Sequence, residues 1–428
     1  MTTAPSVLLS AILSGPAIAD VLVVAPAAGS GVDHTQIHAA IAAASDGDSL
    51  LVKGGTYDSF ILHNRALVIV AERGETVKVA GGFSVRGLTE EQSVVIRGLE
   101  ISSPNETGLG LKNNQGPIWI EDCVFKGGWG DNTFSSTSQA DSYPAVEIVG
   151  CSEVVFARCT LNGGAGLDLW EETFHFAAGS GGHALDIDVG SVSVFDSTLT
   201  GGHGGSVYDT TESPGGSGGS GIYLDSGSVL ISGCTLTGGS GGFGDCSLFF
   251  CGDGGNGGDG VLLSFVAGAE VRHQDCSFSP GNAGFGGGSG GFPGDPGEAI
   301  DVNAGSATAL AGSAHTFTSS SPVREGESAQ LHFGGEPGEI VLAAISTTQD
   351  HLALDPFAGD LVLGAPQILL TMGVVPAAGS LSASVPIGAA PSPFVLARNI
   401  LLQSVHIDSA LSVWLGHASA LTLLDDSL

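Results

Sequence analysis

Acidic side chains recur in five short segments of alternating polarity, and they are the first candidates for chemistry in this sequence. The segments are AVEIV (145–149), ALDID (184–188), GIYLD (221–225), GVLLS (260–264) and AIDVN (299–303). If these segments are strands lying side by side, their middle residues form one outward column, which contains Glu147, Asp186, Tyr223, Leu262 and Asp301. Asp188 and Asp225 follow two positions later. Neighbouring carboxylates can raise the pKa of one of them, as a general acid requires, or share a cation.

This column has two interpretations. In the first, Glu147, Asp186, Asp188 and Asp225 are candidate catalytic acids in a sugar-binding groove. The candidate ligand-binding residues for such a groove are Trp170 and Tyr208 as stacking platforms, together with His203 and Tyr223. In the second interpretation, which we favour, the column is a solvated acidic sheet face on a protein that is acidic throughout. His203 then belongs to a glycine-rich loop.

The segment GGNGGDGVL (254–262) matches a nonapeptide whose glycine and aspartate residues bind calcium in β-rolls. Such calcium sites are shared between successive nine-residue turns, and the nine residues on either side do not match. In the repeat described below, Asp259 instead aligns with Pro144, His183, Ser220 and Glu298. The segment is therefore expected to return a long loop to the repeat. A calcium ion at Asp259 is the alternative, and no other cofactor is expected.

A repeated apolar sequence motif predicts the fold. Five copies of an apolar motif share one position, which is occupied by Cys123, Cys159, Ser197, Cys234 and Cys276. An earlier copy with Leu99 in that position lies 24 residues before Cys123, which is the length of three short strands and three turns. Later steps are longer because a glycine-rich insertion follows the Gly-Gly that ends each motif. Coils of this kind cannot stabilise themselves and must stack, which predicts a parallel β-helix with an inward ladder of reduced cysteines.

Three cysteines lie outside this repeated position. Cys246 and Cys251 lie close together within one insertion, and in an exported protein they are expected to form a local disulfide. Cys151 has no assigned role.

The segment HTQIHAAIAAAS (34–45) has a helical apolar face, and it leads into DGDSLLVKGGTYDSFIL (46–62), a turn with two short strands. A helix here would cover the open end of the coil stack. This combination resembles the N-terminal entry of the right-handed parallel β-helix superfamily of pectin and pectate lyases, and the resemblance covers roughly residues 30–318. It implies the fold and an action on polysaccharide.

The catalytic motifs of that superfamily are not matched. Residues 118–122, IWIED, are similar to a W-I-D-H segment of one lyase family, but Asp122 stands where the histidine belongs. Gly202-His203-Gly204 echoes a G-H-G motif of polygalacturonases, whose aspartate partners are absent. Arg158 and Arg272 are expected to point outward in structural positions. The sequence thus leaves open whether the protein is an enzyme.

The expected organisation is all-β. Residues 1–19 are predicted to be a signal peptide. Residues 20–318 are predicted to form a right-handed parallel β-helix with a capping helix and long glycine-rich loop insertions, and residues 319–428 a small antiparallel β-sandwich. The last part resembles a module of exported bacterial proteins. Residues 350–372 could be helical or β. No segment has the apolar length of a membrane span.

A net charge of −32 argues against nucleic acid and anionic membranes as partners. We therefore expect a secreted or cell-surface scaffold that displays glycine-rich loops, is not catalytic, and binds a polysaccharide or cell-surface glycan. The alternative is a polysaccharide lyase or glycoside hydrolase with an acidic groove. Oligomeric state is not predicted.

Overall fold

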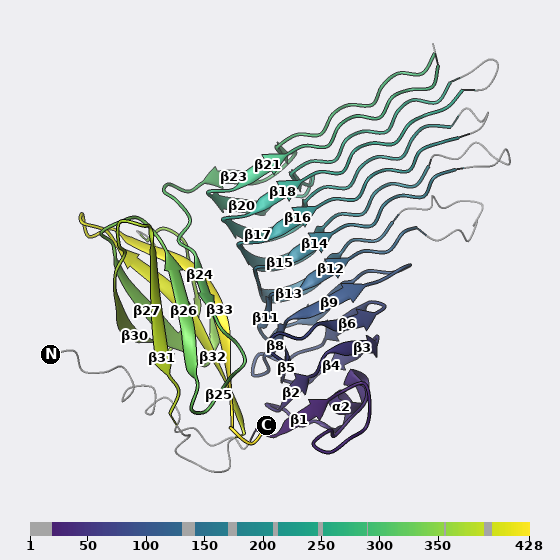
Figure 1. Cartoon of the computed structure of the whole chain (residues 1–428). Coiled ribbons are helices and arrows are strands. Elements are labelled where there is room, and N and C mark those ends of the chain that lie inside the picture. The colour runs from purple at the N-terminus through teal and green to yellow at the C-terminus, as the bar shows by residue number, and fades with distance from the viewer. Residues whose placement is uncertain are drawn as a thin grey trace.

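A computed structural model of the chain describes residues 19–130, 142–169, 178–208, 213–246, 251–288, 290–354, 357–388 and 396–428. The predicted signal peptide lies almost entirely outside these residues. The first three quarters of the chain form the predicted parallel β-helix, and the remainder forms a β-sandwich beside it (Figure 1). Among the described residues, the structure has no helix with the length and apolarity of a membrane-spanning segment.

The β-helix has three faces, and successive strands of each face pair in parallel. The first face contains β1 (Val21–Val24), β2 (Ser49–Val52), β5 (Leu67–Ala71), β8 (Val94–Arg97), β11 (Ile118–Glu121), β20 (Ala269–Gln274), β23 (Ser306–Ala309) and the C-terminal halves of β13 (Val146–Ala157), β15 (Leu185–Phe195) and β17 (Ile222–Ser232). The second contains β4 (Ile61–His63), β7 (Phe83–Arg86), β10 (Leu109–Asn114), the N-terminal halves of β13, β15 and β17, β19 (Val261–Leu263) and β22 (Ile300–Val302). The third contains β3 (Gly55–Asp58), β6 (Val77–Ala80), β9 (Leu99–Ser102), β12 (Val124–Lys126), β14 (Thr160–Asn162), β16 (Thr198–Thr200), β18 (Thr235–Thr237) and β21 (Ser277–Ser279).

The turn between the first and third faces explains the cysteine position in the repeat. The residue just before that position has a positive φ in six successive coils: Gly98, Asp122, Arg158, Asp196, Gly233 and Asp275. Gly and Asp tolerate this left-handed conformation better than most residues. The turn directs the next side chain inward, so that Cys123, Cys159 and Cys234 are fully buried as free thiols. Ser197 continues the column and accepts a hydrogen bond from the Cys159 N–H at 3.0 Å.

A short helix covers the N-terminal end of the stack. Helix α2 (Ile37–Ala43) is shorter than the predicted segment, and it buries Ile37, Ala40 and Ile41 against the first coil. Because these apolar side chains lie on one helical face, the helix closes the core where no earlier coil is present.

The glycine-rich insertions lie where the sequence placed them, between the third and second faces, and the structure shows that they are not irregular. Each insertion sends one extended limb outward and a second limb back, and the limbs of successive coils run side by side as wavy traces (Figure 1). We call these limbs the glycine array. Outgoing limbs form one layer and returning limbs form the other. Their hydrogen bonds repeat every three residues, which is the period of a polyproline-II-like helix.

The two layers of the glycine array are joined by hydrogen bonds that pass back and forth between them. In one such ladder, Gly182 donates to Gly164, Gly202 to Gly182, Gly219 to Gly202 and Gly239 to Gly219, each at 2.8–2.9 Å. Glycine is required at these positions because a Cβ on Gly202 would lie 1.7 Å from the Gly164 carbonyl oxygen. Every third residue can carry a side chain because it points away from the other layer.

The C-terminal domain is the predicted β-sandwich. One sheet contains β24 (Phe317–Ser319), β26 (Ser328–Gly334) and β31 (Ser380–Pro386), and the other contains β25 (Val323–Arg324), β27 (Ile340–Ser346), β30 (Ile368–Val374), β32 (Ala397–Ile407) and β33 (Val413–Leu424). The additional strands β28 (Gln349–Ala353) and β29 (Asp360–Leu363) pair antiparallel, so the described residues of the 350–372 region are β and not helical. A core that includes Phe317, Phe333 and Ile400 fills the space between the sheets.

The sandwich packs against the first face of the β-helix. Outward residues of that face, including Trp119, Phe195 and Leu230, form one buried cluster with Val362 and other residues of the sandwich. A row of outward apolar side chains on a parallel sheet is stable only when another layer covers it. The two domains therefore share a continuous apolar interface.

Candidate functional site

The acidic column exists on the second face of the β-helix. Glu147 pairs with Asp186, Asp186 with Tyr223, Tyr223 with Leu262 and Leu262 with Asp301, which is the order expected from the repeat. Neighbouring parallel strands lie about 4.8 Å apart, so consecutive members of the column are adjacent. Glu147 does not face Asp186 with its full charge, because Lys112 forms an ion pair with Glu147 at 2.7 Å.

Asp186 is the most perturbed carboxyl of this column. Burial raises its pKa from 3.8 to about 6, and the nearby charges of Glu147, Asp188 and Asp225 act in the same direction. The pKa of about 6 makes Asp186 the member of the column suited to hold a proton near neutral pH. Its neighbour Tyr223 stacks on His183 with ring centroids 4.9 Å apart.

The other two candidate acids lie beside Asp186. The strand register around them places Asp188 opposite Asp225. Asp188 is exposed, whereas Asp225 is half-buried and accepts a hydrogen bond from the Ser264 hydroxyl. The four predicted acids are therefore brought together on one sheet face, and a catalytic role for them stays a prediction.

His203 and Asp259 belong to the glycine array, where each accepts a backbone hydrogen bond. The Ser240 N–H donates to Nδ1 of His203 at 3.0 Å, and the Glu298 N–H donates to Oδ1 of Asp259 at 2.7 Å. In both cases the donor is the corresponding outward residue of the next limb. The third N–H of each turn faces away from the opposite layer, and at these positions a side chain of the preceding limb accepts it.

The same hydrogen bond, from a backbone N–H to a side chain of the preceding limb, recurs along both layers. Asp168, His183, Asn256 and Asp253 also accept the N–H of the next limb, from Ser206, Ser220, Asp295 and Phe292 respectively, at 2.7–2.9 Å. Sequence reasoning missed this role, although the signal was present. The signal is a G-G-x period of three residues in which x is Ser, Asn, Asp or His.

Calcium at Asp259 remains an untested prediction. Burial raises the pKa of Asp259, and its Oδ1 is already engaged by Glu298. Within the described part of the chain, two groups of three side chains have the spacing of metal ligands, and Asp259 is in neither. They are His315, Glu339 and His406, and Glu325, Asp425 and Asp426. Nearby in the array, Cys246 and Cys251 form a disulfide.

Aromatic side chains gather on the outgoing layer of the array. Phe243 and Phe285 occupy equivalent positions on adjacent limbs, and their rings stack at 5.8 Å with planes 12° apart. Phe285 is 70% exposed and Phe243 is 47% exposed. Tyr208, a predicted stacking platform, is also exposed, while Trp170 lies outside the described residues.

The segment that resembled a lyase motif lies under the sandwich. Glu121 is fully buried, accepts hydrogen bonds from the Ala420 N–H and the Ser419 hydroxyl, and forms ion pairs with Arg97 and Arg158. Arg272 likewise pairs with the buried Asp360 of the sandwich. These charged residues join the two domains, so no substrate reaches them in this arrangement.

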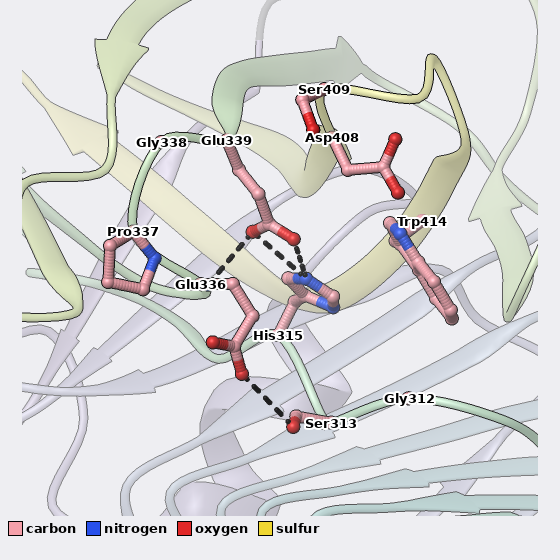
Figure 2. A pocket seen from close by; sticks show the side chains of 10 residues that line it. All are labelled: Gly312, Ser313, His315, Glu336, Pro337, Gly338, Glu339, Asp408, Ser409 and Trp414. Atoms are coloured by element: carbon pink, nitrogen blue, oxygen red, sulfur yellow. Dashed lines mark hydrogen bonds and ion pairs between the residues drawn. The ribbon is translucent and has the colours of Figure 1, made fainter.

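A cavity of about 370 Å³ lies in the sandwich, where the chain leaves the β-helix (Figure 2). His315, Glu336, Glu339, Asp408 and Trp414 are among the side chains that line it. Sequence analysis did not predict this site, because its residues come from distant segments outside the repeat. Burial, together with the charge of His315, lowers the pKa of the adjoining His406 to about 4.

The chain has only remote similarity to the proteins it was compared with. No protein-family model and no curated protein matches the chain. Among solved structures, pectate lyase Pel9A is 12% identical, with 63% of this chain and 79% of that chain aligned and a TM-score of 0.33. The enzymatically active domain of bacteriophage CBA120 tailspike protein 2 is 9% identical, with 96% and 72% aligned and a TM-score of 0.29. The strand pairing of the chain itself defines it as a parallel β-helix protein.

Proposed function

We propose that this protein is a secreted or cell-surface scaffold whose glycine array presents a rigid face that binds extracellular polysaccharide without catalysis. The stacked pair of Phe243 and Phe285 carries the proposal. Large exposed aromatic rings that lie side by side on a surface indicate a binding role. Flat rings of this kind pack against the C–H faces of sugar rings.

The backbone of the array supports the proposal. Many of its amides donate to the opposite layer, to the next limb or to outward side chains, so the face loses little conformational freedom when a ligand binds. Asn282, an exposed polar residue on the same limb as Phe285, offers hydrogen-bonding groups to sugar hydroxyls.

The test is binding to a panel of neutral and acidic polysaccharides by affinity electrophoresis. We expect Phe243→Ala/Phe285→Ala to weaken binding about 10- to 100-fold, because two stacking contacts of about 1 kcal/mol each are lost. Phe265→Ala is the matched control, since Phe265 is 83% exposed but lies in a turn of the β-helix. Equal binding by the double variant, or no binding of wild type to any polysaccharide, would reject the proposal.

One observation favours a second candidate function, a polysaccharide lyase or glycoside hydrolase. The pKa of Asp186, raised to about 6, suits a general acid that protonates a glycosidic oxygen, with Glu147 beside it. The assay is release of reducing or unsaturated sugars, with and without calcium. Turnover that is lost in Asp186→Asn but kept in Asp301→Asn would establish the enzyme. If no polysaccharide is turned over, the enzyme is rejected and the non-catalytic scaffold remains the proposed function.

A further inference from the structure

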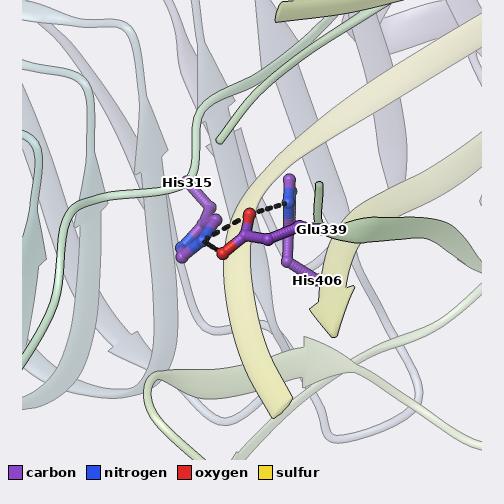
Figure 3. A group of neighbouring side chains, drawn as sticks. All are labelled: His315, Glu339 and His406. Atoms are coloured by element: carbon purple, nitrogen blue, oxygen red, sulfur yellow. Dashed lines mark hydrogen bonds and ion pairs between the residues drawn. The ribbon is translucent and has the colours of Figure 1, made fainter. Parts of the chain in front are cut away.

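We propose that His315, Glu339 and His406 form a binding site for a divalent transition-metal ion, with zinc as the first candidate. The carboxylate of Glu339 lies between the two imidazole rings (Figure 3). Two histidines and one glutamate are a recurrent zinc ligand set that leaves a further position for water or another ligand. The inference is independent of the proposed polysaccharide binding.

The spacing of the ligand atoms fits a metal ion. Nε2 of His315 lies 3.0 Å from Oε1 and 3.1 Å from Oε2 of Glu339, and Nδ1 of His406 lies 3.2 Å from Oε2. Each pair of the chosen ligand atoms is within 4.8 Å. Two ligands on a tetrahedral zinc ion are about 3.3 Å apart, given bonds of 2.0–2.1 Å. Small side-chain movements would therefore complete the coordination.

Three separate elements hold the three side chains. His315 lies in the connection that follows β23 and precedes β24, Glu339 directly precedes β27, and His406 is in β32, paired with Val341. The ring of Trp414 stacks on His315, with centroids 5.7 Å apart. The Glu336 N–H donates to Oε2 of Glu339 at 3.0 Å, which orients the carboxylate.

A close glycine shows that the backbone is shaped around this cluster. A Cβ at Gly335 would lie 2.7 Å from Oε2 of Glu339 and 2.8 Å from Nδ1 of His406. Both contacts are too short for a Cβ unless the Glu339 carboxylate and the His406 ring move, so the backbone passes close to the ligand atoms. A larger residue here would push Glu339 and His406 apart.

Burial makes the cluster costly without a ligand. His406 is fully buried, with its Nδ1 facing the Glu339 carboxylate; its Nε2, on the other side of the ring, has no hydrogen-bond partner among the described residues and is not one of the proposed ligand atoms. Two imidazoles and a carboxylate packed at the edge of an apolar sandwich lose hydration, and their mutual hydrogen bonds satisfy only part of their polar atoms. A metal ion would use the carboxylate charge and both imidazole lone pairs.

The cavity beside the cluster gives an ion access and leaves room for its remaining ligands. His315 and Glu339 line its wall, and the carboxylates of Glu336 and Asp408 lie on other sides (Figure 2). Negative side chains around an opening raise the local concentration of cations. A bound water or a small anion would complete the coordination from the cavity.

The test begins with the full chain after chelation and dialysis. We expect isothermal titration with ZnCl2 and elemental analysis to give one tightly bound zinc per chain, together with a rise in the unfolding temperature. His315→Gln and His406→Gln should each lose at least 10-fold in zinc affinity. His332→Gln is the control, because His332 is exposed on β26 and its Nδ1 contacts the Ser382 hydroxyl. It should bind zinc as wild type does.

A spectroscopic measurement on the wild type keeps the test decisive if a variant fails to fold. Zinc X-ray absorption should show two imidazole ligands and light oxygen or nitrogen neighbours. Cobalt substitution should give the visible absorption bands of a site with fewer than six ligands. The proposal is overturned if the wild type takes up no zinc saturably, if imidazole is absent from the spectrum, or if folded His315→Gln and His406→Gln bind as well as His332→Gln.

Discussion

Substituting alanine for Gly202 tests whether the glycine array is a packed structure. In the structure, the Gly202 N–H donates to the Gly182 carbonyl at 2.8 Å, and its own carbonyl accepts from Gly219 at 2.8 Å. A new Cβ would lie 1.7 Å from the Gly164 carbonyl oxygen. The two layers must separate locally to admit it, because the obstructing atoms belong to the backbone of a neighbouring limb.

The magnitude follows from three contributions. Two hydrogen bonds at about 1 kcal/mol each are lost or stretched, and overpacking adds about 1–3 kcal/mol. Alanine also restricts the unfolded chain, which offsets about 0.4–1 kcal/mol. The free energy of local opening should therefore fall by about 2–4 kcal/mol.

The assay is amide hydrogen exchange followed by mass spectrometry. The array peptides that contain Gly182, Gly202 and Gly219 should exchange roughly 30- to 1,000-fold faster in Gly202→Ala, because each factor of ten corresponds to about 1.4 kcal/mol. Ser217→Ala is the matched control, since residue 217 is an outward position that already carries a Cβ. If both variants exchange at the same rate, the close packing of the two layers is refuted.

Three further predictions concern the β-helix. Because the pKa of Asp186 is raised from 3.8 to about 6 on folding, the folded state binds this proton more tightly; the resulting stabilisation is complete below pH 4 and lost as pH rises through about 6. Asp186→Asn should thus be more stable than wild type at pH 7, by at most about 3 kcal/mol, and the difference should vanish toward pH 4 in thermal unfolding. Glu121→Gln should lower the free energy of unfolding by about 3–5 kcal/mol in urea titrations, because Arg97 and Arg158 would be left without their shared buried carboxylate; a loss under 1 kcal/mol would contradict this. Burial raises the pKa of Cys123 to about 12, so a thiol reagent at pH 8 should label it only in denaturant, and rapid labelling of the folded chain would count against the buried ladder.

The sequence predicts the β-helix well because its repeat identifies both the inward residues and the outward residues of successive coils. The cysteine position follows a tight turn, and each coil from Leu99 onward supplies an inward side chain there. Aligning the coils on that position also gives the correct order of the acidic column from Glu147 to Asp301. Local patterns succeed here because each strand pairs with its own copy one coil away.

The glycine array was harder to predict because its stability is non-local. The limbs do not have the sequence period of an α-helix or a β-strand, and the hydrogen bonds of Gly202 and Gly239 are made to limbs of other coils and of the other layer. A single insertion therefore has the sequence pattern of a loop, and its three-residue period acquires meaning only beside the insertions of neighbouring coils.

The sites that involve the sandwich were missed for a related reason. Glu121 and Arg158 look like outward residues of the repeat until a second domain covers them. His315, Glu339 and His406 come from segments with no internal alignment, so nothing in the sequence links them. Only the folded sandwich brings them within contact distance.

The hydrogen-bond ladder that joins the two layers is regular enough for whole coils to be added to the β-helix. Each coil that carries an insertion contributes one outgoing and one returning limb, and neighbouring limbs are bonded by the same rule. A duplicated coil would widen the array by one pair of limbs without altering the bonding of the others. The number of coils therefore sets the width of the surface, and the residues at every third position set its chemistry, so that the two can vary independently.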